Sequence, residues 1–272
     1  MEKESLSALS ALAHPRRLAV FRLLMRRFPD AVPAGEIAQA LDLPPSSLSV
    51  ALGQLRGAGL VTQRRDGTSL LYAADTEGAG RLIAYLGADC CRGRPDVCLP
   101  MSRGRSGHRF NVLFLCTGNS ARSLMAEALL RKLAGDRFAA YSAGTRPASA
   151  PNPDALQLLR DKDHDLSFLR TKDLSEFRGP EAPVMDFVFT VCDRAANEEC
   201  PPWPGQPMTG HWGQPDPVRA AGSEAERRLA FQQVYGALKN RIQAFAALPV
   251  ETLDRTRLQA RIDTLARMED IA

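Results

Sequence analysis

The sequence lacks any run of about eighteen apolar residues, so it offers no candidate for a membrane-spanning helix. Its first residues, Met1 to Ser5, also lack the basic-then-apolar order of a signal peptide. We therefore expect a cytoplasmic protein with no membrane partner. No repeat with a period of about 20 to 50 residues is visible, which argues against a solenoid.

The sequence has few cysteines for a disulfide-stabilised protein, with six in a chain of 272 residues. Disulfides rarely persist in a reducing compartment, so structural cross-links are not expected here. The thiols are better explained by reactive, metal-binding or redox roles, and their positions decide among these.

The length and the charge distribution both indicate two domains. A chain of 272 residues with 44% hydrophobic content can fill more than one core. Residues 1–106 contain 14 Lys+Arg and 10 Asp+Glu, whereas the remaining residues contain 21 of each, so the formal charge of +4 is N-terminal. This excess suits binding to a phosphate backbone, although it also fits an ordinary solvated surface.

The N-terminal part combines short helical patterns with one hairpin. Apolar periodicity predicts helices over residues 6–13, 16–27, 35–41, 44–57 and 76–88. Two strand-like segments, 60–65 and 69–74, flank Asp66 and Gly67, a dipeptide typical of a tight turn. The hairpin is therefore a candidate wing.

A Ser/Gly/Arg-rich stretch at 102–109 breaks the periodicity and indicates a domain boundary. Beyond it, the pattern predicts buried strands and helices in alternation, at 110–115, 123–133, 154–161, 184–191 and 224–247. This alternation predicts an α/β fold. We place the domains and connecting segments at 1–100, 101–109 (linker), 110–250 and 251–272 (helical tail).

The first of these strands leads into a loop that we expect to bind a tetrahedral oxyanion. The loop reads Cys116-Thr117-Gly118-Asn119-Ser120-Ala121-Arg122-Ser123, and a helix follows it. A loop that closes onto a helix N-terminus aims several backbone N–H groups at one point, and the helix dipole adds positive potential there. Gly118 permits the tight curvature, and residues 117–123 are the predicted substrate-binding residues.

The same loop predicts an activated nucleophile. Arg122 is expected to clamp the oxyanion and to lower the pKa of the Cys116 thiol, so that Cys116 is a thiolate at neutral pH. From position alone, Ser123 is placed to hydrogen-bond that thiolate, and Asn119 to brace the loop. The alternative is a buried, inert cysteine at the end of a strand.

On these residues, segment 110–247 resembles the low-molecular-weight protein tyrosine phosphatases, a fold that bacteria also use for arsenate reductases. The resemblance implies a three-layer α/β domain with a central parallel sheet. The pair Asp216-Pro217 stands where this family places its general acid, so Asp216 is a candidate for protonating the leaving oxygen. An Asp-Pro pair is otherwise a common turn former.

Two features favour the reductase over the phosphatase. Phosphatases of this fold follow the acid with two tyrosines, but residues 218–220 are Val, Arg and Ala. Instead, Cys192 and Cys200, separated by seven residues, resemble the arsenate reductase arrangement. The resemblance implies that Cys116 attacks arsenate, Cys192 attacks the adduct and releases arsenite, and Cys200 takes over the disulfide. An external thiol reductant of the thioredoxin or glutathione (glutaredoxin) type then restores the thiols, and no permanently bound cofactor is implied. Cys200 as a bystander is the alternative.

The order of four helices, a hairpin and a fifth helix resembles the winged-helix repressors of the ArsR type over residues 5–90. The joins at 13–17 and 55–61 add to the likeness. The resemblance implies an α+β winged helix-turn-helix domain that binds operator DNA as a homodimer. The DNA-binding residues we expect are Ser46, Ser47, Ser49 and Gln54 at the bases and phosphates of a major groove, with Arg64 and Arg65 on the flanking backbone. An ordinary solvated face is the alternative.

Three further cysteines follow the last helix of this part. Cys90, Cys91 and Cys98 bring three soft thiolates within reach of one ion, and arsenite favours three-sulfur coordination. Members of the family often bind arsenite on the recognition helix, but residues 47–51 contain no cysteine. We therefore predict an arsenite effector site at Cys90, Cys91 and Cys98. Zinc with a fourth ligand and incidental surface thiols are the alternatives.

The sequence thus predicts a bifunctional arsenic-response protein, in which a repressor that arsenite releases from DNA is fused to an arsenate reductase. Two other interpretations stay open. In one, the second domain is a phosphatase joined to a DNA-binding domain. In the other, it is a catalytically silent sensor of oxyanions or redox state.

Overall fold

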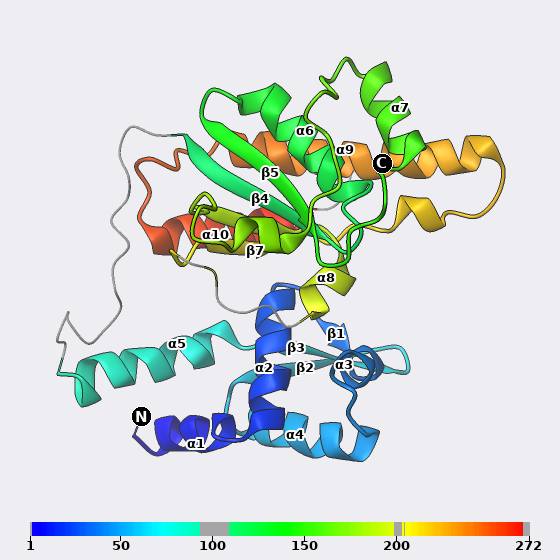
Figure 1. Cartoon of the computed structure of the whole chain (residues 1–272). Helices are drawn as coiled ribbons and strands as arrows, with labels where there is room; N and C mark the ends of the chain where they lie inside the picture. The colour runs from blue at the N-terminus through cyan, green and yellow to red at the C-terminus, as the bar shows by residue number, and fades with distance from the viewer. Residues whose placement is uncertain (1, 93–108, 199–202, 204, 269–272) are drawn as a thin grey trace. The chain divides into compact units, whose positions relative to one another are not determined.

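A computed structural model describes residues 2–92, 109–198, 203 and 205–268 (Figure 1). The chain divides into two compact units, one made chiefly of residues 1–103 (the N-terminal unit) and the other chiefly of residues 104–272 (the C-terminal unit). The predicted linker at 101–109 lies almost wholly outside the described residues. Every helix within the described ranges is too short or too polar to cross a membrane.

The N-terminal unit combines short helices with a small antiparallel sheet of order β1-β3-β2. Its elements are α1 (Glu2–Leu12), α2 (Pro15–Arg27), β1 (Val32–Pro33), α3 (Ala34–Leu41), α4 (Pro45–Gly57), β2 (Val61–Asp66), β3 (Ser69–Ala74), α5 (Thr76–Tyr85) and a π-helical turn, η1 (Leu86–Cys90). Proline occupies the first turn of α2 and α4, where its missing N–H costs no hydrogen bond. The side chains of His14 and Asp75 accept backbone N–H groups at the starts of α2 and α5.

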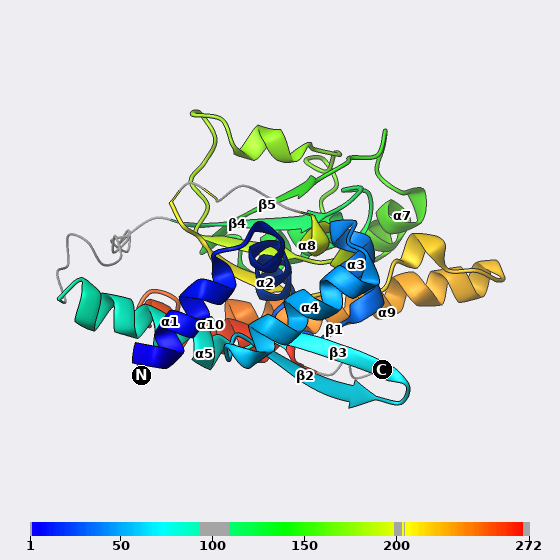
Figure 2. The ribbon, with the colours of Figure 1, turned by 90° about the horizontal axis from the view of Figure 1, so that it is seen from below.

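The predicted hairpin is present and projects from the helices (Figure 2). Strands β2 and β3 pair from Val61 with Ala74 to Asp66 with Ser69. Gly67 has a φ of 56°, a left-handed conformation that glycine adopts without a steric penalty. The order of helices and hairpin confirms the predicted helix-turn-helix fold of this unit, and strand β1 is an addition that the sequence did not predict.

The C-terminal unit is built on a parallel sheet of order β5-β4-β6-β7. Its elements are β4 (Phe110–Cys116), α6 (Arg122–Ala134), β5 (Phe138–Gly144), α7 (Pro153–Asp161), η2 (Leu174–Phe177), β6 (Phe187–Thr190), α8 (Asp193–Asn197), β7 (Met208–His211), η3 (Pro217–Arg219), α9 (Glu224–Ala246) and α10 (Arg255–Ala266). The central parallel sheet confirms the predicted α/β class.

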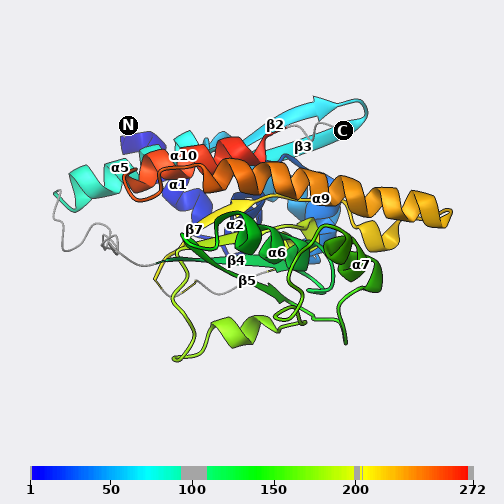
Figure 3. The same ribbon diagram turned by 90° about the horizontal axis from the view of Figure 1, so that it is seen from above.

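Side chains of β4 point alternately to two apolar layers, as the period of a strand requires. Phe114 faces the helices and packs with Phe189, Trp212 and Phe245 in the larger core. The opposite face has its own core, which includes Phe177 of η2. Figure 3 shows the long α9 and α10 along one side of the sheet and the light-green segment with η2 along the other. The unit therefore has three layers.

Helix α10 belongs to this core. Its residues Leu258, Ile262 and Leu265 are buried in the same cluster as the sheet. An added Cβ at Gly210 in β7 would lie 2.9 Å from the Ile262 Cγ2 atom, so a larger residue there would have to displace the Ile262 side chain. The segment that the sequence set apart as a tail thus packs directly on the edge strand β7.

Candidate functional site

The loop from Cys116 to Ser123 lies between the end of β4 and the start of α6. Its carbonyl groups are bound from outside by segment 145–152: the Thr145, Arg146, Ala148 and Asn152 N–H groups donate to the Cys116, Thr117, Gly118 and Ser120 oxygens at 2.8–3.2 Å. Since a peptide N–H points away from its neighbouring C=O, this pattern turns amides of the loop inward. The loop can therefore hold an oxyanion at the N-terminus of α6.

Two residues give the loop room to close. Asn119 adopts a left-handed φ of 44° at its tip. Gly144 at the end of β5 lies so close that an added Cβ would come within 2.7 Å of the Thr117 carbonyl oxygen. A residue larger than glycine at position 144 would displace the loop.

The Cys116 sulfur lies inside this loop and is 3% exposed. The Asn119 N–H donates to it at 3.1 Å, and the Ser123 hydroxyl lies 2.9 Å away. Because Ser123 Oγ already accepts from Asn119 Nδ2 at 2.8 Å, its own proton is available to the sulfur. The structure thus brings Cys116, Asn119 and Ser123 together around the thiol.

The predicted lowering of the Cys116 pKa is wrong for this arrangement. Burial raises the pKa of the thiol, and the nearby Cys192 raises it further. Hydrogen bonds from Ser123 and the charge of Arg122 lower the pKa, but they do not outweigh burial. The Arg122 guanidinium is also engaged by a carboxylate, because its Nη2 atom lies 3.0 Å from Asp216 Oδ2.

Removing the Ser123 hydroxyl should shift the ionisation of Cys116 upward. Because a hydrogen bond to a charged group contributes about 1.5–3 kcal/mol, we expect Ser123→Ala to raise the pH midpoint of Cys116 alkylation by roughly one to two pH units. The measurement is the rate of iodoacetamide modification against pH, followed by peptide mass mapping. Ser167→Ala, on an exposed loop, is the matched control. An unchanged midpoint in Ser123→Ala would show that the Ser123 hydroxyl does not stabilise the Cys116 thiolate.

A buried polar chain braces the loop from behind. Asn119 Nδ2 donates to Ser142 Oγ at 2.9 Å, and its Oδ1 accepts the Lys172 N–H at 2.7 Å. Ser142 donates at 2.6 Å and the Lys172 ammonium at 2.8 Å to the same Glu127 carboxylate oxygen. Lys172, Glu127 and Ser142 are 6%, 1% and 0% exposed, and no motif in the sequence predicts their association.

Neutralising Lys172 should destabilise the C-terminal unit. The Lys172→Met variant leaves the Glu127 carboxylate buried with Arg131, 3.2 Å away, as its remaining cation. Breaking a buried ion pair typically costs about 3–5 kcal/mol, so we expect a loss of about 3 kcal/mol in the free energy of unfolding, measured in urea. Lys239→Met, on the exposed face of α9, should change it by less than about 0.5 kcal/mol. Equal stabilities of the two variants would contradict the expectation.

Arg122 and Asp216 meet at the mouth of the loop. Arg122 donates from Nη1 to the Gln214 carbonyl at 2.9 Å, in addition to its ion pair with Asp216. The side chains of Arg122 and Asp216 are 12% and 31% exposed. The structure therefore brings the predicted clamp and the predicted acid together, although 94 positions separate them in the sequence.

Cys192 is the second thiol at this site. It lies two residues after the end of β6, is 2% exposed, and its sulfur lies 3.6 Å from Thr117 Oγ1 in the loop. Its sulfur also accepts the Ala195 N–H at 3.4 Å. Cys116 and Cys192 are both free thiols. Cys200 lies outside the described residues.

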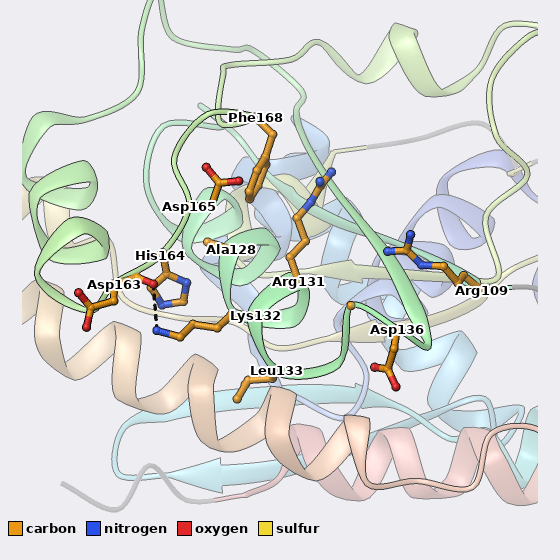
Figure 4. Close-up of a pocket in the computed structure, with 11 residues that line it drawn as sticks. Arg109, Ala128, Arg131, Lys132, Leu133, Asp136, Asp163, His164, Asp165 and Phe168 are labelled. Carbon is orange, nitrogen blue, oxygen red and sulfur yellow. Dashed lines mark hydrogen bonds between the residues drawn. The ribbon is translucent and has the colours of Figure 1, made fainter.

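A separate pocket of about 720 Å³ opens on α6 and does not resemble an oxyanion site (Figure 4). Its cations are already bonded: Lys132 donates to the Lys162 and Asp163 carbonyls, and Arg109 donates to the Phe138 carbonyl. Carboxylates line it as well. The loop around Cys116 is therefore the better anion site.

In the N-terminal unit, the predicted DNA-binding residues occupy two elements. Ser46, Ser47, Ser49 and Gln54 lie on α4, and Arg64 and Arg65 lie on β2; all are exposed except Ser47, which is half-buried. Two further residues of this surface were not predicted from the sequence. Arg17 binds Gln54 Oε1 at 2.6 Å, and Val50 is 61% exposed on α4 beside a pocket of about 330 Å³.

The predicted effector cysteines are only partly within the described residues. Cys90, at the end of η1, is exposed, and the adjacent Cys91 is half-buried. Cys98 lies outside the described residues. The two described thiols follow α5 without a break, so they lie at the end of the helix-turn-helix unit.

Comparison with known families decides what the two units are. A family model for the low molecular weight phosphotyrosine protein phosphatases matches residues 111–259, more than half of the chain. The chain belongs to this family. A second model, for a helix-turn-helix domain, matches residues 12–64. Both predicted resemblances are confirmed at this level, while the ArsR type of the first domain stays a prediction.

Relatives within the family are named arsenate reductases. One from Oceanobacillus iheyensis is 38% identical over 135 residues, which cover 50% of this chain and 94% of that protein. One from Bacillus subtilis is 38% identical with the same coverage. A solved structure described as an arsenate reductase in the phosphate-binding state is 25% identical, with a TM-score of 0.43, over 51% of this chain and 97% of that chain.

Proposed function

We propose that the C-terminal unit reduces arsenate to arsenite. The observation that carries this proposal is the second thiol, Cys192, beside the oxyanion loop. Hydrolysis of a phosphate ester needs one nucleophile, whereas reduction of arsenic needs two electrons, which a pair of thiols supplies when it becomes a disulfide. The names of the relatives support the same activity.

The first step forms a covalent adduct. The Cys116 sulfur attacks arsenic while the amides of residues 117–123 and the Arg122 guanidinium hold the arsenate oxygens. A sulfur–arsenic bond forms and one oxygen leaves as water. The thiol proton passes to that oxygen with Asp216 as the relay, so the step needs no other acid or base.

The second step reduces the metalloid. Cys192 attacks the Cys116 sulfur, the sulfur–arsenic bond breaks, and its electron pair stays on arsenic. As(V) becomes As(III), two thiols become one disulfide, and arsenite leaves with the Cys192 proton. Cys200 then takes over the disulfide, and an external thiol of the thioredoxin or glutaredoxin type reduces it.

An arsenate reduction assay with competing thiol donors tests this function. Fully reduced protein is mixed with arsenate, and free thiols and arsenite are counted. We expect one arsenite per disulfide, and sustained turnover only with a suitable donor. Hydrolysis of p-nitrophenyl phosphate without thiol oxidation would favour the phosphatase, and arsenate binding without turnover would favour a silent sensor.

We also propose that the N-terminal unit is an ArsR-type repressor that binds operator DNA as a homodimer. The helix-turn-helix match and the exposed polar side chains of α4 support DNA binding. Arsenite bound by Cys90, Cys91 and Cys98 would release the DNA. Because one chain carries both activities, arsenite made at Cys116 reaches these thiols at a high local concentration.

Substitution of the three effector cysteines should separate sensing from DNA binding. We expect Cys90→Ser, Cys91→Ser and Cys98→Ser combined to bind operator normally but to require at least about tenfold more arsenite for release, since three-sulfur coordination is lost. Fluorescence anisotropy with labelled operator measures this. Cys192→Ser is the matched control for added arsenite. A wild-type release curve in the triple variant would exclude the site.

A further inference from the structure

We propose that His211 is a positioning residue for the second thiol of the cascade, a role that rests on the proposed arsenate reduction. Its imidazole is bound at both ring nitrogens. Nδ1 lies 2.7 Å from Thr190 Oγ1, and Nε2 lies 3.1 Å from Asp193 Oδ1. The two partners stand on either side of the segment that carries Cys192.

The location of these contacts gives them their effect. Strand β6 ends at Thr190 and helix α8 begins at Asp193, so Val191 and Cys192 form a two-residue connection. One ring of β7 therefore holds both ends of the connection. An ionised carboxylate only accepts hydrogen bonds, so Nε2 carries a proton, and in the neutral ring Nδ1 accepts from the Thr190 hydroxyl. We name these three residues, His211 with Thr190 and Asp193, the His211 clamp.

Backbone contacts tie the same connection to the loop that carries Asp216. The Trp212 N–H donates to the Thr190 carbonyl at 2.8 Å, and the Gln214 N–H donates to the Val191 carbonyl at 3.3 Å. The Gln214 carbonyl in turn accepts from Arg122. These backbone bonds, which do not involve the His211 ring, join the connection that carries Cys192 to the loop that carries Asp216.

Gly213 is the residue that leaves room for the clamp. An added Cβ would lie 2.5 Å from Asp193 Oδ1 and 2.8 Å from His211 Nε2, too close to both bonded atoms. A side chain here would push the carboxylate away from the ring. The absence of a Cβ at position 213 is therefore part of the same device.

The His211 clamp acts only on the second step of the reaction, the attack by Cys192. Attack of Cys116 on arsenate uses the loop, Arg122 and Asp216, whereas the His211 ring bonds to Thr190 and Asp193, on either side of Cys192. Attack of Cys192 on the adduct requires its sulfur to stay beside Thr117, where it lies 3.6 Å from the hydroxyl. Misplacing a reacting group by about 1 Å can cost about 100-fold in rate, so the second step should be sensitive to the clamp.

The test separates the two steps in one protein. Reduced full-length protein carrying Cys200→Ser is mixed with arsenate and quenched, and the Cys116–Cys192 disulfide is quantified by peptide mass mapping. His211→Phe, which fills the ring volume without its nitrogens, should form this disulfide at least about tenfold more slowly. Inorganic phosphate affinity and the alkylation rate of Cys116 should stay within about twofold of the parent.

Paired substitutions of the partners keep the proposal falsifiable if His211→Phe does not fold. Thr190→Val and Asp193→Ala should slow disulfide formation, whereas Thr190→Ser and Asp193→Asn, which keep a hydroxyl and an acceptor, should restore it. Gly213→Ala should behave as Asp193→Ala does.

Two outcomes would overturn the proposal, and a third would overturn the function on which it rests. Parent-like disulfide formation in His211→Phe would exclude the role, and an equal fall in phosphate affinity and disulfide rate would show a merely structural one. A parent protein that forms no Cys116–Cys192 disulfide would instead defeat the proposed reductase.

Discussion

Cys116→Ser is expected to abolish arsenate reduction while leaving the fold and the oxyanion loop in place. A serine hydroxyl is similar in size to the thiol but does not form the sulfur–arsenic bond through which two electrons pass to arsenic. Removing a catalytic nucleophile lowers turnover by more than about 10⁴-fold, so activity should fall to background. Arsenite production with an excess of thiol donor is the measurement.

The control for this result is a cysteine outside the catalytic unit. Cys90→Ser makes the same chemical change on the exposed end of η1 and should reduce arsenate at the parent rate. Phosphate should still bind Cys116→Ser, because the amides of the loop and Arg122 remain. Residual arsenate-dependent thiol oxidation in Cys116→Ser would place the nucleophile elsewhere.

Cys192→Ser is expected to stop the reaction between its two steps. The first thiol still attacks the oxyanion, but no neighbouring sulfur breaks the sulfur–arsenic bond, so arsenite formation should fall by more than about 10³-fold. Hydrolysis of p-nitrophenyl phosphate, if the parent shows any, should survive because it needs only Cys116, Arg122 and Asp216. The two activities are measured on the same preparation.

The contrast between the two variants decides between enzymes. A reductase loses arsenite production in both variants. A phosphatase keeps hydrolysis of p-nitrophenyl phosphate in Cys192→Ser and loses this hydrolysis only in Cys116→Ser. Arsenite production by Cys192→Ser at the parent rate would remove the second thiol from the mechanism.

Local patterns predicted the parts of the fold that depend on neighbours in sequence. The Cys116 loop could be recognised because strand, glycine and helix N-terminus follow one another within a few residues. The helices of the N-terminal unit have clear apolar periodicity and proline at their first turns. In contrast, β5 reads Phe-Ala-Ala-Tyr-Ser-Ala-Gly, and β7 is four residues long with a glycine inside it. Their strand character comes from pairing within the sheet, which no local pattern encodes.

The ionisation of Cys116 could not be predicted for a similar reason. The sequence shows Arg122 six residues away, but it does not show that Asp216 pairs with that guanidinium or that the thiol is 3% exposed. Burial and the nearby Cys192 raise the pKa of the Cys116 thiol, and both are tertiary effects. The support from Lys172 and Glu127, 45 positions apart, is hidden for the same reason.

The seat of α10 on β7 bears on how this chain tolerates shortening. Strand β7 is the last in the order β5-β4-β6-β7, and Ile262 covers its Gly210. Ending the chain before Arg255 would bare an apolar strip beside an unpaired strand edge, which is a known route to aggregation. Helix α10 therefore protects the C-terminal unit from association with other copies of the chain through the edge of β7.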